Sequence, residues 1–249
     1  MDLWAACGAG RAPMAITGRL SRVVESQEQV ATMNLVDDLA EQSAIEQLLD
    51  RGKPPYRAGT EHLHYLLSTP FRYPPLRHGS RFGQRHEQSI FYGSLGWQTA
   101  LAEAAYYRLV FWHGQVVPPA FPYKTQHLLF EADYATPDGL RLQGLECESY
   151  RAVIANPSDY TATQAMGTTM RDAGIRAFEY PSARSPVGGV NVGLFEPDAL
   201  AADRPTSMQN WLCKTSAAQV VFNARDPDRL IGFAIDDFTM NGVLPQPAI

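Results

Sequence analysis

The chain has 249 residues, of which 45% are hydrophobic and 19% are charged, and its formal net charge at pH 7 is -5. This composition is typical of a globular protein with one large domain or two small ones. A mildly acidic chain is not expected to have nucleic acid or a membrane surface as its main partner, because both favour clustered Lys and Arg. No apolar run approaches the roughly 20 residues that a membrane-spanning helix needs.

Two features of the sequence favour a reduced, cytoplasmic location. Residues 1–14 contain no basic segment followed by a long apolar core, so we do not expect secretion. The cysteines Cys7, Cys147 and Cys213 are scattered and never form a CxxC pair. We therefore expect them to be buried small side chains rather than members of disulfides or metal sites.

Residues 1–52 predict a helical N-terminal extension. Asn34 is a candidate N-cap and Gly52 a candidate stop signal for a helix between them. The sequence Lys53–Pro55 then breaks any helix, which predicts a boundary between the extension and a main domain over residues 53–249. The apolar residues with near-helical spacing are Leu35, Val36, Leu39, Ile45, Leu48 and Leu49.

The main domain predicts an α+β fold, because short strands outnumber helices and do not alternate regularly with them. Residues 97–112, rich in Ala and Leu, predict a helix, and residues 160–174 predict another that is closed by Gly174. The polar segment 76–88 predicts a loop. Strands are expected at residues 56–60, 89–94, 126–134, 175–183, 189–195, 216–224 and 229–236.

Several common chemical motifs are absent from the sequence. There is neither a phosphate-binding G-x-x-x-x-G-K-[ST] loop nor a G-x-G-x-x-G fingerprint between a strand and a helix. The segment "YGSLG" around Ser94 lacks the first glycine of a nucleophile elbow, where Tyr92 stands instead. His62 and His64 would suit two metal ligands on one strand face, but no third ligand is nearby. We expect two ordinary imidazoles and no metal.

Glu103 is the most informative residue of the chain. From Trp97 to Trp112 it shares the helix with only one other charge, Arg108. None of its neighbours one helical turn away is basic; they are Thr99, Ala100, Tyr106 and Tyr107. An enclosed carboxylate without partners costs several kcal/mol. Glu103 therefore either faces solvent or meets polar groups from elsewhere in the fold.

Five polar side chains are candidates for such a meeting, and each has a simpler structural interpretation. Arg57 and Arg81 would clamp an anion or a ribose, or lie on the surface of a strand and a loop. Tyr92 would offer its ring face to a flat cationic ligand, or belong to the core. Ser182, after a proline at a strand end, and Asn191, in "GGVNVG", are otherwise ordinary turn and strand residues.

The order of these segments resembles the RES domain family, the toxin half of RES–Xre toxin–antitoxin modules. The matching pieces are "YRAG", "GSRFG", "SIFYGSLGWQTALAEAAYYR", "YPSAR" and "GGVNVGLF", and residues 18–50 resemble the N-terminal extension of longer members. One departure is Ser80, which separates Gly79 from Arg81 where the family pattern has Gly directly before Arg.

This resemblance implies a fold similar to ADP-ribosyltransferases of the diphtheria-toxin type, with a split β-sheet core and flanking helices. It implies NAD+ as a substrate rather than a cofactor, and an Xre-like helix-turn-helix antitoxin as partner; assembly into a homo-oligomer stays open. The family's essential Arg, Tyr, Glu and Ser fall on Arg57, Tyr92, Glu103 and Ser182. The NAD+ contacts implied are Arg57, Arg81, Tyr92 and Asn191.

The chemistry of NAD+ cleavage agrees with a single carboxylate. Nicotinamide leaves as a neutral molecule, so no second acid is needed to protonate it, unlike in ordinary glycosidases. Glu103 would bind a ribose hydroxyl and stabilise the positive charge on the sugar. Either water or phosphate would accept the ribosyl group. Two alternatives remain: ADP-ribose transfer to a protein, which Leu101 two residues before Glu103 disfavours, and a non-catalytic binding module in which Glu103 braces a base.

Overall fold

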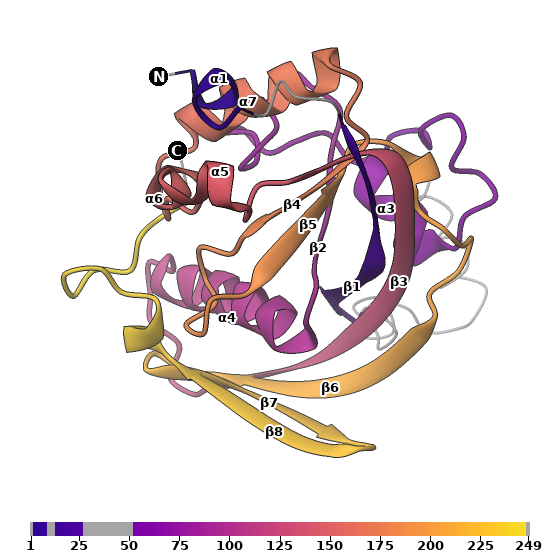
Figure 1. The fold of residues 1–249 in the computed structure, drawn as a ribbon. Helices are drawn as coiled ribbons and strands as arrows, with labels where there is room; N and C mark the ends of the chain where they lie inside the picture. Colours follow the sequence, from indigo (N-terminus) through magenta and orange to yellow (C-terminus); the bar gives the residue numbers. More distant parts are fainter. Residues whose placement is uncertain (1, 9–12, 27–51, 248–249) are drawn as a thin grey trace.

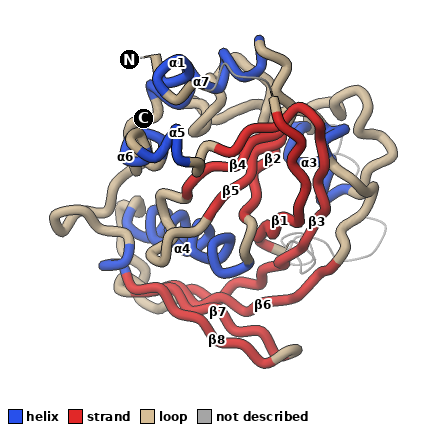
Figure 2. The backbone as a smooth tube through the Cα atoms, viewed as in Figure 1, coloured by secondary structure: helices blue, strands red, loops and turns tan. Residues whose placement is uncertain are grey.

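The computed structural model describes residues 2–8, 13–26 and 52–247. They fold around an eight-stranded sheet with the order β1-β2-β5-β4-β3-β6-β7-β8, in which only β3 and β4 pair in parallel (Figures 1 and 2). The expected α+β class is confirmed. The strands are β1 (Met14–Glu25), β2 (Phe91–Ser94), β3 (Tyr123–Arg141), β4 (Ala177–Pro181), β5 (Val190–Leu194), β6 (Ser207–Thr215), β7 (Gln219–Arg225) and β8 (Asp228–Ala234).

The sheet divides along its longest strand, β3. One edge of β3 pairs with β1 over most of its length. The other edge pairs with β6 as far as Glu131, and with β4 from Gly139 onward. β1 also bonds to β2 through Ser21 and Ser94, so β2, β5 and β4 form one part of the sheet and β6, β7 and β8 another. Figure 1 shows α4 lying between these two parts.

Helices cover both sides of this divided sheet. The predicted helix at 97–112 is confirmed as α4, which packs against β6–β8 through Leu101, Ala105 and Leu109. The predicted helix at 160–174 is confirmed as α7, and Gly174 follows it with φ +76°. The helices are α1 (Leu3–Ala6), α3 (Tyr65–Arg72), α4 (Trp97–His113), α5 (Leu145–Glu148), α6 (Arg151–Ile154) and α7 (Thr161–Asp172), with 3-10 turns η1 (Pro197–Ala199) and η2 (Ile235–Asp237).

The prediction of a helical segment over residues 1–52 is wrong for Met14–Glu25, which forms strand β1. This strand pairs with β3 from Met14 opposite Gly139 to Glu25 opposite His127. Residues 13–26 therefore belong to the sheet of the main domain, not to an extension that ends at a boundary near residue 53. The helix predicted between Asn34 and Leu49 lies outside the described residues.

Residues 56–60 correct a second prediction, because they form turns and no strand. The other predicted strands are present, and the three cysteines are buried thiols that form no disulfide with one another. Within the described part of the chain, no helix has the length and apolar character needed to cross a membrane.

Candidate active site

The Glu103 carboxylate receives two hydrogen bonds from distant parts of the chain. Its Oε1 accepts from Ser182 Oγ at 2.7 Å and from Asn191 Nδ2 at 2.6 Å. Ser182 follows the end of β4 and Asn191 lies in β5, so the two paired strands deliver both donors to α4. Of the two interpretations of Glu103, the partnered one is observed. No described residue donates a hydrogen bond to its second oxygen, Oε2.

Both donors are themselves held in place. Ser94 Oγ donates to Asn191 Oδ1 at 2.7 Å, which turns the Asn191 amide nitrogen toward Glu103. Ser182 Oγ accepts from the backbone N–H groups of Arg184 and Ser185, at 3.1 Å each. Its own proton is therefore directed to Glu103. The carboxylate is fixed before any ligand arrives, as electrostatic preorganisation requires.

A glycine allows α4 to approach the strands closely enough for these bonds. A Cβ built at Gly189 would lie 2.0 Å from Thr99 Oγ1, near the start of α4. Only a residue without a side chain fits there, two positions before Asn191. The glycine in "GGVNVG" thus sets the separation of helix and strand at the site.

Glu103 lies in the wall of a cavity of about 350 Å³ between α4, β1, β2 and the loop before β2. Glu103 is the only acid among the described residues that line this cavity. Three arginines also line this cavity: Arg22, Arg81 and Arg184. An isolated carboxylate in a cation-rich cavity suits a ligand that carries both a positive and a negative group.

Tyr92 lines the cavity from β2, as its predicted role requires. Its hydroxyl exchanges a hydrogen bond with Ser80 Oγ at 2.9 Å and accepts one from Phe82 N at 3.1 Å. Burial raises the pKa of Tyr92 to about 12, so the phenol is neutral at physiological pH. The hydroxyl is tied to the loop, and the ring is the part of Tyr92 that a ligand would contact.

Arg81 and Arg184 both hold the segment between α6 and α7. Arg81 donates to the carbonyl oxygens of Ile154 and Asn156, at 3.1 and 2.6 Å, and stacks over Tyr160 at 4.5 Å. Arg184, which is buried, donates to the carbonyl of Pro157 and stacks over Tyr106 at 3.5 Å. Arg81 is at the cavity as predicted, although Ser80 precedes it. Sequence reasoning missed Arg184, which stands two residues after Ser182.

Arg57 is not brought to Glu103, contrary to its predicted role. Its guanidinium donates to the carbonyl of Phe195 at 2.8 Å and to Glu196 Oε2 at 2.5 Å, and it lines no cavity described here. The reason is that residues 56–60 form no strand, so Arg57 braces the end of β5 instead. The two histidines of "HLH" also lie in a loop; His64 Nδ1 accepts from Leu66 N at 3.3 Å and caps α3.

Arg22 on β1 occupies the position that sequence reasoning gave to Arg57. It donates to the carbonyl of Tyr92, lies 5.3 Å from the Phe91 ring, and lines the Glu103 cavity. Its Nε is shielded from water and has no hydrogen-bond partner, and burial lowers the pKa of Arg22 to about 10. One signal in the sequence could have identified Arg22. It is the only charged residue at the positions that alternate with a period of two, Ile16, Leu20, Arg22 and Val24.

Comparison with known protein families supports the resemblance seen in the sequence. The family model of the RES domain matches residues 54–216. No curated protein matches the chain. Among solved structures, the crystal structure of the M. tuberculosis MbcT–MbcA toxin–antitoxin complex has a chain with 11% identity and a TM-score of 0.47; the match covers 84% of this chain and 91% of that one. The family assignment rests on the match over residues 54–216 and not on this structural likeness.

Proposed function

The chain belongs to the RES domain family, and from this premise we propose that it is the toxin of a toxin–antitoxin module and cleaves the nicotinamide–ribose bond of NAD+. The observation that carries the proposal is the Glu103 carboxylate. It is fixed by Ser182 and Asn191 through one oxygen, and its other oxygen accepts no hydrogen bond from a described residue. It is also the only acid among the described residues that line its cavity.

The reaction needs one carboxylate, which is what the cavity offers. Nicotinamide departs from the cationic pyridinium as a neutral base, so the electrons of the breaking bond need no proton. Positive charge develops on the ribose ring as the bond breaks. Glu103 Oε2 would accept a hydrogen bond from a ribose hydroxyl and stabilise that charge. Tyr92 would lie against the nicotinamide ring.

The cations of the cavity fit the rest of the substrate. NAD+ carries a diphosphate. Among the three arginines that line this cavity, Arg22 is the one whose Nε is buried without a hydrogen-bond partner. A diphosphate oxygen bound at the Arg22 guanidinium would offset the cost of burying its charge. In this proposal Arg22 has the NAD+-binding role that the resemblance implied for Arg57.

The same proposal includes a protein partner and a cellular setting. A chain that consumes NAD+ stops growth unless something blocks it, so we expect an Xre-like helix-turn-helix antitoxin that binds this protein in the cytoplasm. Either water or phosphate would accept the ribosyl group, and the two acceptors give different products.

The test is release of free nicotinamide from NAD+ by the purified protein, with and without added phosphate. We expect release by the wild type and a loss of at least about a hundredfold in Glu103→Gln, the size seen when a preorganised charge-stabilising group is removed. ADP-ribose or its 1-phosphate in the product mixture identifies the acceptor. No release by the wild type, or equal release by Glu103→Gln, contradicts the proposal.

Glu179 supplies a matched control. It is a buried carboxylate, 3% exposed, and it lines neither cavity. Its oxygens accept from Tyr134 Oη at 2.9 Å and Gln143 Nε2 at 2.6 Å, and Arg141 Nε lies 3.2 Å away. Glu179→Gln should lower the melting temperature and keep most activity per folded molecule. Glu103→Gln should keep the wild-type melting temperature and lose nicotinamide release.

The binding-module alternative required Glu103 to brace a base in the core. Its hydrogen-bond donors are instead the neutral side chains of Ser182 and Asn191. A glutamine at position 103 can still accept both bonds through its amide oxygen, so a bracing role would survive in Glu103→Gln. A folded but inactive variant therefore separates catalysis from bracing.

A further inference from the structure

A second cavity, of about 870 Å³, opens beside the Glu103 cavity. The two share five lining residues, which form the junction between them: Arg22, Leu76, Gly79, Ser80 and Tyr92. The first cavity is small for a complete dinucleotide, since pockets for single drug-sized ligands already span about 300–1,000 Å³. Two joined cavities with an arginine at the junction match the shape of a two-part ligand linked by an anionic group.

One face of α3 forms part of the wall of the second cavity. Leu67 and Phe71 of this helix point into the core. The positions that line the cavity recur at helical spacing and include an exposed aromatic at each end; they are Tyr65, Leu66, Thr69, Pro70, Arg72 and Tyr73. Tyr65 is 53% exposed, whereas the Arg72 guanidinium lies over the half-exposed ring of Tyr56, at 4.1 Å. Exposed tyrosines at a cavity wall provide flat surfaces on which a base can stack.

The charge of this wall is mainly positive. Arg22, Lys53 and Arg72 line the cavity, and the single acid among its described lining residues is Glu25. Glu25 is paired with Arg108 at 2.9 Å. Aromatic rings combined with cations favour a ligand that has a planar ring and a negative charge, which is the chemistry of a nucleotide.

We propose that the second cavity binds the adenosine half of NAD+, with the base against Tyr65 and the diphosphate at Arg22. This inference rests on the proposed function, because it extends the same site. The Glu103 cavity then holds the nicotinamide riboside half, and the enzyme distinguishes a dinucleotide from nicotinamide mononucleotide by contacts remote from the bond that breaks. Binding energy from such remote contacts serves to orient the reacting half.

Two probes test the two halves separately: ADP, which carries the adenosine and diphosphate, and nicotinamide mononucleotide. Their dissociation constants are measured calorimetrically for the wild type, Tyr65→Ala and Thr69→Trp, which places a bulky ring in the cavity. We expect both variants to weaken ADP binding by about five- to a hundredfold, the range for loss of one base-stacking contact. Binding of the mononucleotide should stay within about twofold of wild type.

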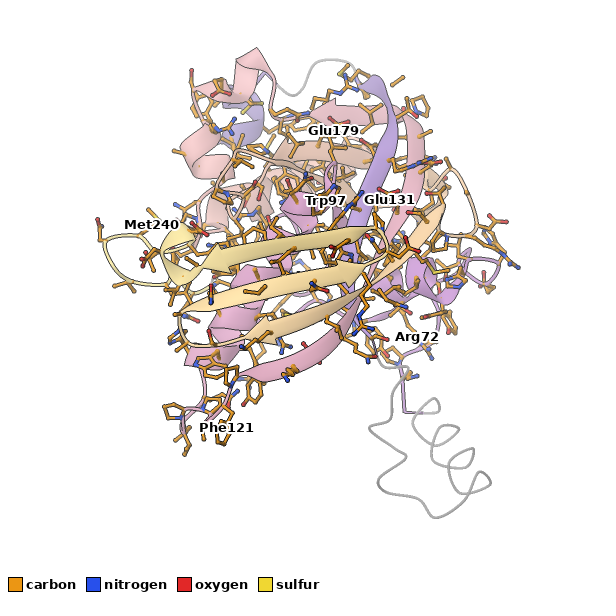
Figure 3. All side chains as sticks on the ribbon, turned by 90° about the horizontal axis from the view of Figure 1, so that it is seen from below. Arg72, Trp97, Phe121, Glu131, Glu179 and Met240 are labelled. Carbon is orange, nitrogen blue, oxygen red and sulfur yellow. The ribbon has the colours of Figure 1, made fainter. Side chains whose placement is uncertain are left out.

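Phe121→Ala is the matched control, because Phe121 is 80% exposed and lines neither cavity. Figure 3 shows it well away from Arg72, which ends α3. This variant should bind ADP as the wild type does. Absence of ADP binding, or equal ADP binding by the wild type, Tyr65→Ala and Thr69→Trp, overturns the second-cavity assignment. If ADP binds as expected but NAD+ yields no nicotinamide, the proposed function fails and the nucleotide site stands.

Discussion

Arg22 combines two properties that conflict unless it has a ligand. Its Nε is enclosed without a partner, and its lowered pKa reflects the cost of removing a charge from water. A residue kept for stability would be expected to satisfy its polar atoms. An unpaired buried nitrogen costs stability, and the substrate-binding role proposed for Arg22 gives a reason to keep the arginine.

Replacing Arg22 by methionine should separate stability from activity. Exchange of a buried charge for an apolar side chain of similar length is often neutral or stabilising. We expect the free energy of unfolding of Arg22→Met to change by less than about 2 kcal/mol, since contacts with Phe91 are kept while the hydrogen bond to the Tyr92 carbonyl is lost. The kcat/KM for NAD+ should fall at least about tenfold, mainly through KM. Chemical denaturation and steady-state kinetics measure the two effects. A variant that loses several kcal/mol of stability would show that Arg22 is structural.

Asn191 donates a hydrogen bond to Glu103 Oε1 from its amide nitrogen, 2.6 Å away. Asn191→Asp replaces this donor by a second carboxyl group. Two acids at that distance cannot both ionise readily, so the apparent pKa of the pair rises. The acid limb of the pH–rate profile should move to higher pH and activity at pH 7 should fall at least tenfold. Asn210→Asp, exposed on β6, is the control and should leave the profile unchanged. An unshifted acid limb in Asn191→Asp would contradict this account.

Individual site residues were predictable to different degrees. Glu103 was predictable because none of its neighbours one helical turn away is basic. Ser182 and Asn191 were two of five candidate partners, and the sequence did not show that these two would be the ones to bind it. Arg57 stands in a segment predicted to be a strand, whereas Arg22 stands in the segment predicted to be helical. Their sequences do not reveal which one reaches the cavity, because that depends on which segment enters the sheet.

At the scale of elements, the position of α4 depends on its contact with the loop before β5. Gly189→Ala would place a methyl group 2.0 Å from Thr99 Oγ1 and force helix and strand apart. We expect a loss of about 1–3 kcal/mol of stability and reduced nicotinamide release, because Asn191 moves away from Glu103. Thr99→Ala should partly restore both in the double variant, measured as a double-mutant cycle. Strictly additive effects would show that the contact does not set the geometry.

The assignment of β1 shows why the N-terminal prediction failed. The helical spacing between Leu35 and Leu49 was extended to the whole segment before residue 53. Within Met14–Glu25 the inward positions instead alternate, but Gly18 and Arg22 interrupt the apolar series and hide the period of two. After residue 120 the alternation is clearer, and strands were predicted within β3, β4, β5, β7 and β8, whereas β6 (Ser207–Thr215) was missed.

At the scale of the whole molecule, the division of the sheet was not predictable from local patterns. It depends on β3 pairing with β1, more than a hundred residues earlier, and on the sharing of its other edge between β4 and β6. Such pairings are non-local choices that no segment encodes alone. The division of the sheet along β3 nevertheless matters for the proposed function, because α4, which carries Glu103, lies between the two parts of the sheet (Figure 1).

The pH dependence of global stability should depend on His127, near the start of β3. This side chain is 3% exposed, its Nδ1 has no partner, and it packs edge-on against Phe222. The charge nearest to it is Arg108 of α4, which pairs with Glu25 of β1. Burial, assisted by Arg108, lowers the pKa of His127 from 6.5 to about 4.

As the pH decreases from about 6.5 to about 4, the unfolded chain therefore binds a proton at position 127 that the native protein does not. The free energy of unfolding falls through this window, by at most about 1.4 kcal/mol per pH unit, and the contribution is fully present above pH 6.5. His127→Gln removes the titration, so its stability should depend less steeply on pH there. The measurement is urea denaturation at half-unit steps from pH 7 to pH 4. His86→Gln, at an exposed loop position, should keep the wild-type slope. A slope in His127→Gln equal to that of the wild type would show that His127 is not the group responsible.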